Sequence, residues 1–252
     1  MTQPSLPSRF PRILPVGDEA VTVEFGDSID DLVNRRVYAF ADAVTNAQIK
    51  GVTELVPTYR SLLIQYDLVR TGCAELSRHL RELVDNLPVT IKSGAQPRII
   101  IEVPVAYGGE FGPDLEFVAQ HASLPADEVV RIHSHQPYRV YMLGFSPGFP
   151  YLGGVDQRIA CPRLKTPRTR VAAGSVGIAE TQTGVYPNES PGGWRIIGRT
   201  PVRLFDPIAE PPVLARPGAF IQFVPVDHGR FREISDQVQS GTYAVRVSEG
   251  IA

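Results

Sequence analysis

Four cationic side chains lie within eight residues of a chain whose net charge is only −2. The cluster consists of Arg163, Lys165, Arg168 and Arg170. Guanidinium and ammonium groups bind carboxylates and phosphates through charge-assisted hydrogen bonds. We therefore expect a site for an anionic substrate here, completed by Gly174, Ser175, Gln182 and Arg199. The alternative is a solvated or interface-facing loop, and the residue types leave both open.

Ser175 stands in the sequence Ala-Gly-Ser-Val-Gly, which resembles the nucleophile elbow of serine hydrolases. An elbow places its serine between a strand and a helix. Residues 178–186 have no helical pattern. We therefore expect Ser175 to offer a hydroxyl or backbone donor to a ligand rather than to act as a nucleophile.

Candidates for proton transfer are few in this region. Glu180, Glu189 and His135 are the nearest groups suited to acid–base catalysis. His133 and His135 also have the spacing that places two metal ligands on one face of a strand. They fall at the end of a predicted helix, however, where residues two apart do not face each other. We expect no metal site, and a polar contact near the mouth of the site for these histidines.

Glycine, proline and aromatic residues are concentrated in three motifs, at residues 144–154, 162–175 and 181–199. Glycine and proline restrict backbone shape for steric reasons. Loops held in fixed conformations on a rigid scaffold often carry binding sites. We expect a pocket here, although core or subunit interface is the alternative for each aromatic residue singly. The predicted pocket-lining residues are Phe145, Pro147, Gly148, Phe149, Tyr151, Tyr186 and Trp194.

The elements that precede the motifs alternate between strands and helices. Apolar runs predict strands at residues 13–16, 20–25, 52–57 and 61–66. Apolar residues at helical spacing predict helices at 29–47 and around 76–87, and Ser28 or Asp30 is suited to cap the first. This pattern predicts an N-terminal α+β domain at residues 1–87. A linker is expected at 88–97, where both periods break.

From residue 98 onward the pattern changes to short strands separated by turns. Helices are expected at 117–122, 127–134 and 231–239. Strands are expected at 98–105, 138–143, 171–178, 185–186, 194–197, 202–205, 220–224 and 243–247. Many short strands with few helices predict a closed or nearly closed barrel at residues 98–252.

Composition narrows the class of protein. Apolar residues at 43% and charged residues at 21% are typical of a globular protein with a substantial core. The net charge of −2 argues against general nucleic-acid binding. Two isolated cysteines, no signal sequence and no apolar run of membrane-spanning length lead us to expect a cytoplasmic protein.

Residues 144–154, 162–175 and 186–199, in that order and spacing, resemble the family of the 5-oxoprolinase B subunit. The family is also called allophanate hydrolase subunit 1 or the KipI (sporulation kinase inhibitor) family. The resemblance extends from about residue 11 to residue 247. It implies an α+β N-terminal domain followed by a mainly-β, cyclophilin-like barrel domain, which is the division that the pattern predicts.

The resemblance also implies an activity. Members pair with a second cyclophilin-like subunit, of the type of the 5-oxoprolinase C subunit or allophanate hydrolase subunit 2, and a third lactam-processing protein completes the enzyme. Together they open 5-oxo-L-proline to L-glutamate at the expense of ATP, with Mg²⁺. Phosphorylation of the lactam oxygen would create a better electrophile. The active site is implied to be shared, this chain alone is expected to be inactive, and ATP is implied to bind here or on a partner.

Two alternatives remain open at this point. The first is an allophanate- or urea-type amide-processing subunit, although the Ser-Ser segment of amidases is absent from the chain. The second is a non-catalytic inhibitor of a histidine kinase. A partner subunit and a lactam-processing protein among the neighbouring genes would favour the enzyme, and a kinase operon would favour the inhibitor.

Overall fold

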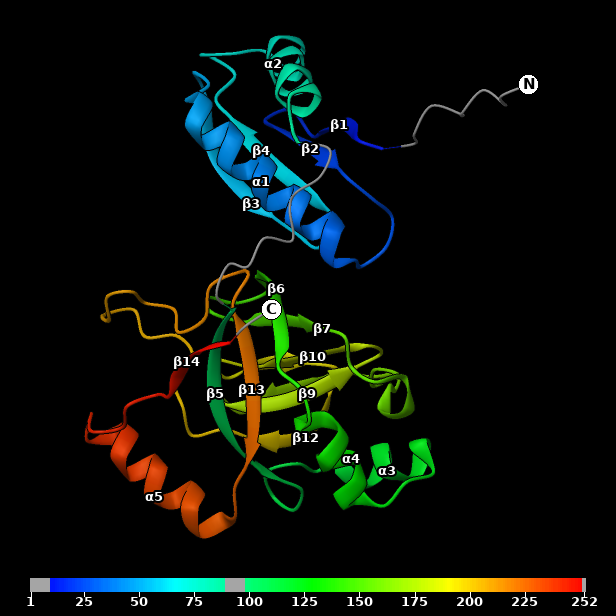
Figure 1. Ribbon diagram of the computed structural model, residues 1–252, viewed down its shortest axis with the longest axis vertical. Coiled ribbons are helices and arrows are strands. Elements are labelled where there is room, and N and C mark those ends of the chain that lie inside the picture. The colour runs from blue at the N-terminus through cyan, green and yellow to red at the C-terminus, as the bar shows by residue number, and fades with distance from the viewer. Residues whose placement is uncertain (1–9, 89–97, 251–252) are drawn as a thin grey trace. The chain divides into compact units, whose positions relative to one another are not determined.

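The computed structural model describes residues 10–88 and 98–250 of the chain, so the predicted linker lies almost entirely outside the described residues. The chain divides into two compact units, residues 1–94 and 95–252 (Figure 1). The predicted domain boundaries at 87 and 98 stay a prediction, and each unit is described by itself.

The N-terminal unit is a four-stranded antiparallel sheet covered by two helices. The strand order is β1-β2-β4-β3. The strands are β1 (Arg12–Val16), β2 (Ala20–Glu24), β3 (Val52–Pro57) and β4 (Ser61–Tyr66). Alternate residues of the two central strands are buried, among them Val21, Val23, Leu62 and Ile64. This period of two turns one face of the sheet toward the core.

Two helices supply the other half of that core. Helix α1 (Asp31–Ala47) packs on β3 and β4, and α2 (Cys73–Asp85) packs on β1 and β2. Helix α1 begins where the Asp30 carboxylate accepts a hydrogen bond from the Val33 backbone N–H at 3.0 Å. Such a cap satisfies a backbone donor that has no partner within the helix. The strands and helices predicted for this part of the chain are therefore present.

The C-terminal unit is a closed barrel of seven strands. Around the barrel the order is β5-β12-β9-β10-β7-β6-β13, and β13 closes it by pairing in parallel with β5. Their bounds are β5 (Arg98–Tyr107), β6 (Tyr138–Leu143), β7 (Pro150–Gly153), β9 (Ser175–Ala179), β10 (Gln182–Val185), β12 (Arg195–Arg199) and β13 (Phe220–Pro225). Strand β14 (Val247–Gly250) extends the sheet beside β5, while β8 (Arg168–Val171) and β11 (Ser190–Gly192) form a separate ribbon. The barrel predicted from the short strands is confirmed, and it fits a cyclophilin-like fold.

Three helices pack against the barrel. Helix α3 (Leu115–Ala122) packs on β12, α4 (Ala126–Ser134) on β13, and α5 (His228–Gln239) on β5 (Figure 1). A short 3₁₀ helix, η1 (Gln157–Ile159), lies against α3 and α4. None of the described helices is both long and apolar enough to cross a membrane.

Three strand predictions were wrong. The strand predicted at 171–178 is two strands, β8 and β9, because Gly174 turns the chain with a φ of +80°. A Cβ at Gly174 would overlap the Thr200 carbonyl oxygen, so only glycine fits. Residues 202–205 form only an isolated bridge between Phe205 and Val213. The last strand begins at Val247, where the predicted one ends.

Candidate functional site

One cavity of the C-terminal unit is lined by residues of all three motifs. Its volume is about 190 Å³, which is smaller than the roughly 300–1,000 Å³ of sites for drug-sized ligands. A cavity of this size suits a molecule built around a single ring. The lining residues are Phe145, Phe149 and Tyr151 from the first motif, Arg163, Leu164 and Pro167 from the second, and Tyr186, Gly192, Gly193 and Trp194 from the third.

The floor of this aromatic pocket is a cluster of edge-to-face rings. The Phe149 ring centroid lies 5.2 Å from that of Tyr186 and 5.5 Å from that of Trp194, with the planes nearly perpendicular. Edge-to-face pairs are favoured because the positive ring edge meets the negative ring face. Gly184 lets the rings approach, since a Cβ there would lie 3.0 Å from Trp194 and 3.1 Å from Phe149.

Phe145 stands at the mouth of the pocket. Its side chain is 62% exposed although it is a large apolar residue. Its backbone is left-handed, with a φ of +61°, a conformation that is uncommon for a bulky residue. Strained backbone of this kind is concentrated at ligand-binding and switch segments. The conformation aims the ring at Phe149 and Tyr186, with centroids 5.6 and 6.3 Å away.

Arg163 is the cationic side chain that lines the pocket. Its guanidinium carbon lies 5.9 Å from the centre of the Trp194 ring. Within residues 10–88 and 98–250 it forms no ion pair with a carboxylate. Burial raises the pKa of Tyr151 and of Tyr186, and the nearby charge of Arg163 opposes part of the rise. Both phenols are therefore protonated at neutral pH, suited to hydrogen bonding rather than to proton abstraction.

Two of the other predicted anion-binding cations are bound to carboxylates. Both terminal nitrogens of Arg168 donate to the Asp114 carboxylate at 2.9 Å, and this hydrogen bonding raises the Arg168 pKa. The Arg170 Nε lies 2.7 Å from a Glu189 carboxylate oxygen. Lys165 is exposed and does not line the pocket. Arg163 is therefore best placed to meet an anion in the pocket.

None of the predicted acid–base residues lines the pocket. Glu180 is exposed in the turn between β9 and β10, with a φ of +54°, and Glu189 is bound to Arg170. His135 is exposed immediately after α4. Their roles in catalysis stay predictions.

The remaining predicted residues lie in the scaffold around the pocket. Gly174 and Ser175 are buried where β9 begins, Gln182 begins β10, and the Arg199 Nε donates to the Ala173 carbonyl at 2.8 Å. Pro147 and Gly148 form the turn between Phe145 and Phe149 without lining the cavity. Of the seven predicted lining residues, the structure thus places Phe145, Phe149, Tyr151, Tyr186 and Trp194 around the cavity.

The prediction for His133 was wrong, because this side chain lies inside the barrel and is completely buried. Its Nδ1 lies 2.8 Å from the Tyr107 hydroxyl and its Nε2 lies 2.9 Å from Thr183 Oγ1. The Thr183 hydroxyl donates its one proton to the Gly177 carbonyl at 2.9 Å. Nε2 must therefore carry the imidazole proton and Nδ1 must accept from Tyr107. Burial lowers the His133 pKa from its ordinary value of 6.5 to about 3.

Asp114 is a residue of the site region that the sequence did not indicate. Its carboxylate contacts Arg168, 54 residues away in sequence, and the Ile196 backbone, 82 residues away. A lone aspartate before a short helix carries no local signal of such contacts. Among the described residues, no three histidine, cysteine or acidic side chains are grouped as metal ligands would be.

A second cavity, of about 480 Å³, lies in the N-terminal unit. It is an open depression lined by both apolar and acidic residues, including Val16, Asp18, Glu19 and Tyr66. None of the three motifs contributes to it. We therefore regard the aromatic pocket as the candidate site.

Comparison with known proteins gives consistent matches over most of the chain. The model of a family described as carboxyltransferase domain, subdomain C and D, matches residues 11–215. The 5-oxoprolinase B subunit of Bacillus subtilis is 42% identical over an alignment of 236 positions that covers 88% of this chain and 96% of that protein. The 5-oxoprolinase B subunit of Escherichia coli O157:H7 is 37% identical over an alignment of 219 positions that covers 85% of this chain and 95% of that protein.

Comparison with solved structures agrees with these sequence matches. A conserved uncharacterised protein of Pyrococcus horikoshii is 50% identical, with a TM-score of 0.51, and the match covers 87% of this chain and 100% of that one. The urea amidolyase of Kluyveromyces lactis has a TM-score of 0.83 over 95% of this chain and 16% of its own, at 23% identity, a likeness of fold alone. The chain therefore belongs to the family of the 5-oxoprolinase B subunit, as its three motifs predicted.

Proposed function

We propose that this chain is a subunit of a 5-oxoprolinase, the enzyme that opens the lactam of 5-oxo-L-proline to L-glutamate, and that the aromatic pocket holds the substrate. The observation that carries the proposal is the convergence of the three motifs on one small pocket with Arg163 at its edge. Identity of 37–42% with proteins named as the B subunit of 5-oxoprolinase supports the same reaction.

The substrate has two features that this pocket matches. Its five-membered ring is small and nearly flat, with an apolar methylene edge opposite the lactam, and the rings of Phe149, Tyr186 and Trp194 offer a surface for that edge. Its carboxylate needs a cation, which Arg163 supplies without giving up another ion pair among the described residues. Phe145 at the mouth would then cover the bound ring and exclude water.

The active site is proposed to be completed by a partner. Glu180, Glu189 and His135 do not line the pocket, so the acid–base group for ring opening would come from another subunit. The bacterial relatives are each named as one lettered subunit of an enzyme, which implies a complex of several subunits. We propose that the second cyclophilin-like subunit and the third lactam-processing protein belong to it, and that this chain alone does not turn over substrate.

ATP, with Mg²⁺, is proposed to bind mainly outside this chain. A polyphosphate carries several negative charges and requires several available donors or a glycine-rich loop around it. In the cation cluster, Arg168 and Arg170 are already neutralised by Asp114 and Glu189. The cation cluster, as the described residues place it, therefore does not fit a complete polyphosphate site. The chemistry that ATP supplies would be activation of the lactam oxygen.

The test is turnover by the reconstituted complex. The three proteins are co-purified and glutamate formation from 5-oxo-L-proline is measured with and without ATP. We expect turnover that requires every component and ATP, and an Arg163→Gln complex whose KM is higher by about ten- to a hundredfold, the effect of losing a charge-assisted hydrogen bond. Arg158→Gln is the matched control, because Arg158 pairs with Asp156 away from the pocket. An unchanged KM in Arg163→Gln would contradict the proposed substrate position.

A urea-type substrate is the second candidate. The urea amidolyase of Saccharomyces cerevisiae is 24% identical over an alignment of 271 positions that covers 93% of this chain and 14% of that protein. If the complete complex leaves 5-oxo-L-proline unchanged but consumes urea or allophanate, this candidate replaces the first.

A further inference from the structure

Asp114 lies just before α3, and its carboxylate is buried between the second and third motifs. The side chain is 8% exposed. Both of its oxygens accept from Arg168 at 2.9 Å, which is the two-point geometry that fixes an arginine most firmly. One of them also accepts from the Ile196 backbone N–H at 2.7 Å. One carboxylate therefore holds two segments that are distant in sequence.

The contact with Ile196 occurs where a barrel strand is irregular. The pairing of β12 with β9 shifts register between Ile196 and Gly198. At this bulge Asp114 forms hydrogen bonds with both the backbone N–H and the backbone carbonyl of Ile196. The Asp114 carboxylate accepts from the N–H, and the Asp114 backbone N–H donates to the carbonyl at 2.8 Å. Trp194, in the floor of the pocket, is two residues earlier in the chain. Asp114 thus fixes the strand that presents Trp194.

The contact with Arg168 fixes one wall of the same pocket. Arg168 follows Pro167, which lines the cavity, and it is paired across the β8–β11 ribbon with Gly192, which also lines it. Asp114 itself does not line the cavity. It acts on the pocket from behind, through the floor and through one wall.

A second guanidinium stabilises the buried charge. Arg195 Nη1 lies 4.0 Å from the Asp114 carboxylate, and its guanidinium carbon lies 3.5 Å from the centre of the Phe117 ring. Its Nε donates to the Pro162 carbonyl at 3.2 Å. The carboxylate therefore has two guanidinium groups and a backbone N–H around it inside the protein, where an unpaired charge would be strongly unfavourable.

We propose that Asp114 is a positioning residue for the aromatic pocket: it holds Arg168 and Ile196 so that the wall at Pro167 and Gly192 and the floor at Trp194 keep the spacing that a ligand requires. Its effect on 5-oxo-L-proline rests on the proposed function, whereas its effect on pocket geometry does not.

Trp194 makes the proposal measurable without a ligand. It is the one tryptophan of the chain and is 5% exposed, so intrinsic emission reports on the pocket floor. In Asp114→Asn, below its melting temperature, we expect red-shifted emission and acrylamide quenching increased severalfold. A role in overall stability alone would lower the melting temperature and leave the emission of the folded protein unchanged.

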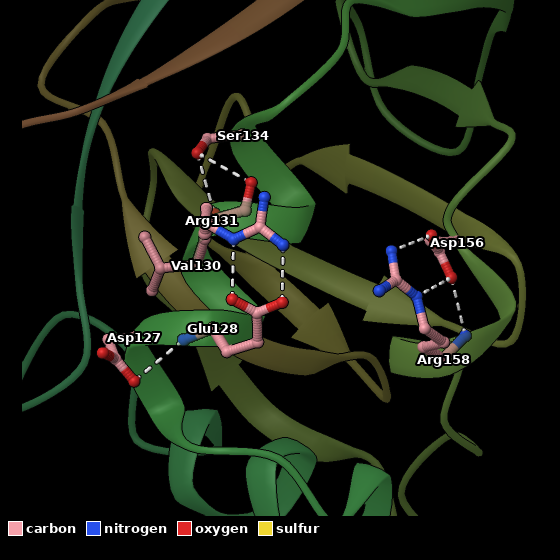
Figure 2. Close-up of polar contacts among 7 residues, drawn as sticks. All are labelled: Asp127, Glu128, Val130, Arg131, Ser134, Asp156 and Arg158. Atoms are coloured by element: carbon pink, nitrogen blue, oxygen red, sulfur yellow. Dashed lines mark hydrogen bonds and ion pairs between the residues drawn. The ribbon is translucent and has the colours of Figure 1, made fainter.

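Two further variants complete the design. Arg168→Lys keeps the charge but loses the two-point contact, so it should fold and still shift the emission, and it answers the question if Asp114→Asn does not fold. Glu128→Gln is the control. The Arg131 Nε and Nη2 each donate to a Glu128 carboxylate oxygen at 2.6 Å. Figure 2 shows these two parallel contacts on α4. Loss of that pair should leave the emission unchanged.

The outcomes separate this proposal from the proposed function. Emission shifts in Asp114→Asn or Arg168→Lys, with a loss of 5-oxo-L-proline affinity of about tenfold or more, support both. Emission shifts in a protein whose wild type does not bind 5-oxo-L-proline support the positioning role and contradict the substrate. Wild-type emission and quenching in every one of these two variants that folds would overturn the positioning role.

Discussion

Acid should destabilise the barrel unit through His133. The buried imidazole is neutral in the folded state, with its proton on Nε2 and its Nδ1 occupied by the Tyr107 hydroxyl. A second proton would have no acceptor at Tyr107 unless that hydroxyl turned away. Burial accordingly lowers the pKa from 6.5 to about 3. In the unfolded chain the same side chain takes up a proton near pH 6.5.

The direction of the effect follows from that difference. The stability contributed by neutral His133 is fully present above pH 6.5 and is lost as the pH falls from 6.5 toward 3. One pKa unit corresponds to about 1.4 kcal/mol, so the free energy of unfolding should fall by about 2 kcal/mol between pH 8 and pH 5. Two carboxylates with lowered pKa values, Asp156 and Glu128, also contribute stability to the protein that is lost in acid. This loss occurs only below their ordinary pKa values of 3.8 and 4.5.

The assay is denaturant unfolding of the wild type and of His133→Phe at several pH values, followed by Trp194 emission, which reports on the same unit. Phenylalanine is similar in shape and does not titrate. The substitution leaves Tyr107 and Thr183 without their partner and lowers the free energy of unfolding equally at pH 8 and pH 5. The difference between wild type and variant in their pH dependence therefore isolates the titration of His133. We expect the wild type to lose about 2 kcal/mol more than His133→Phe between pH 8 and pH 5. Equal losses in the two proteins would refute the assignment of a buried neutral imidazole.

Three further predictions concern the pocket. Gly192→Ala should destabilise the barrel unit by about 1–3 kcal/mol in denaturant unfolding, because a Cβ there would overlap the Tyr186 hydroxyl. Gly193→Ala should be tolerated, because the nearest atom to its added Cβ lies 3.6 Å away, and equal effects of the two substitutions would contradict the packing. Trp194→Ala should cost about 3–5 kcal/mol, measured by circular dichroism, and a wild-type stability would show that the ring is not part of a core. Phe145→Gly should leave the melting temperature unchanged or raise it, because glycine adopts the left-handed backbone without strain, and it should lower ligand affinity. A clear fall in melting temperature would mean that the Phe145 ring stabilises the fold.

Much of the fold could be predicted from local pattern. The strands at 52–57, 61–66 and 138–143 have the predicted bounds, because each is an apolar run between turn residues. Strand β7 was missed because it begins at Pro150 and ends at Gly153, with only two residues between them. The strand predicted at 171–178 failed because Gly174 was not recognised as the left-handed turn between two strands.

The site was predictable in part. The density of aromatic residues and glycines indicated where a pocket would form, and five of the seven residues predicted to line it surround the cavity. The charge cluster was harder to interpret. Sequence alone could not show that Asp114 neutralises Arg168 and that Glu189 neutralises Arg170, because these pairs depend on how distant segments meet in space. Arg163 differs from them only through its tertiary surroundings.

The central claim is that the aromatic pocket binds 5-oxo-L-proline. The most direct test is to titrate the purified chain with this compound and to follow the emission of Trp194. We predict a saturable change for 5-oxo-L-proline, a much weaker one for 2-pyrrolidinone, which has the same ring without the carboxylate, and loss of the difference in Arg163→Gln. If emission does not change at concentrations that saturate turnover by the complex, or if the two compounds bind equally well, the pocket is not the substrate site.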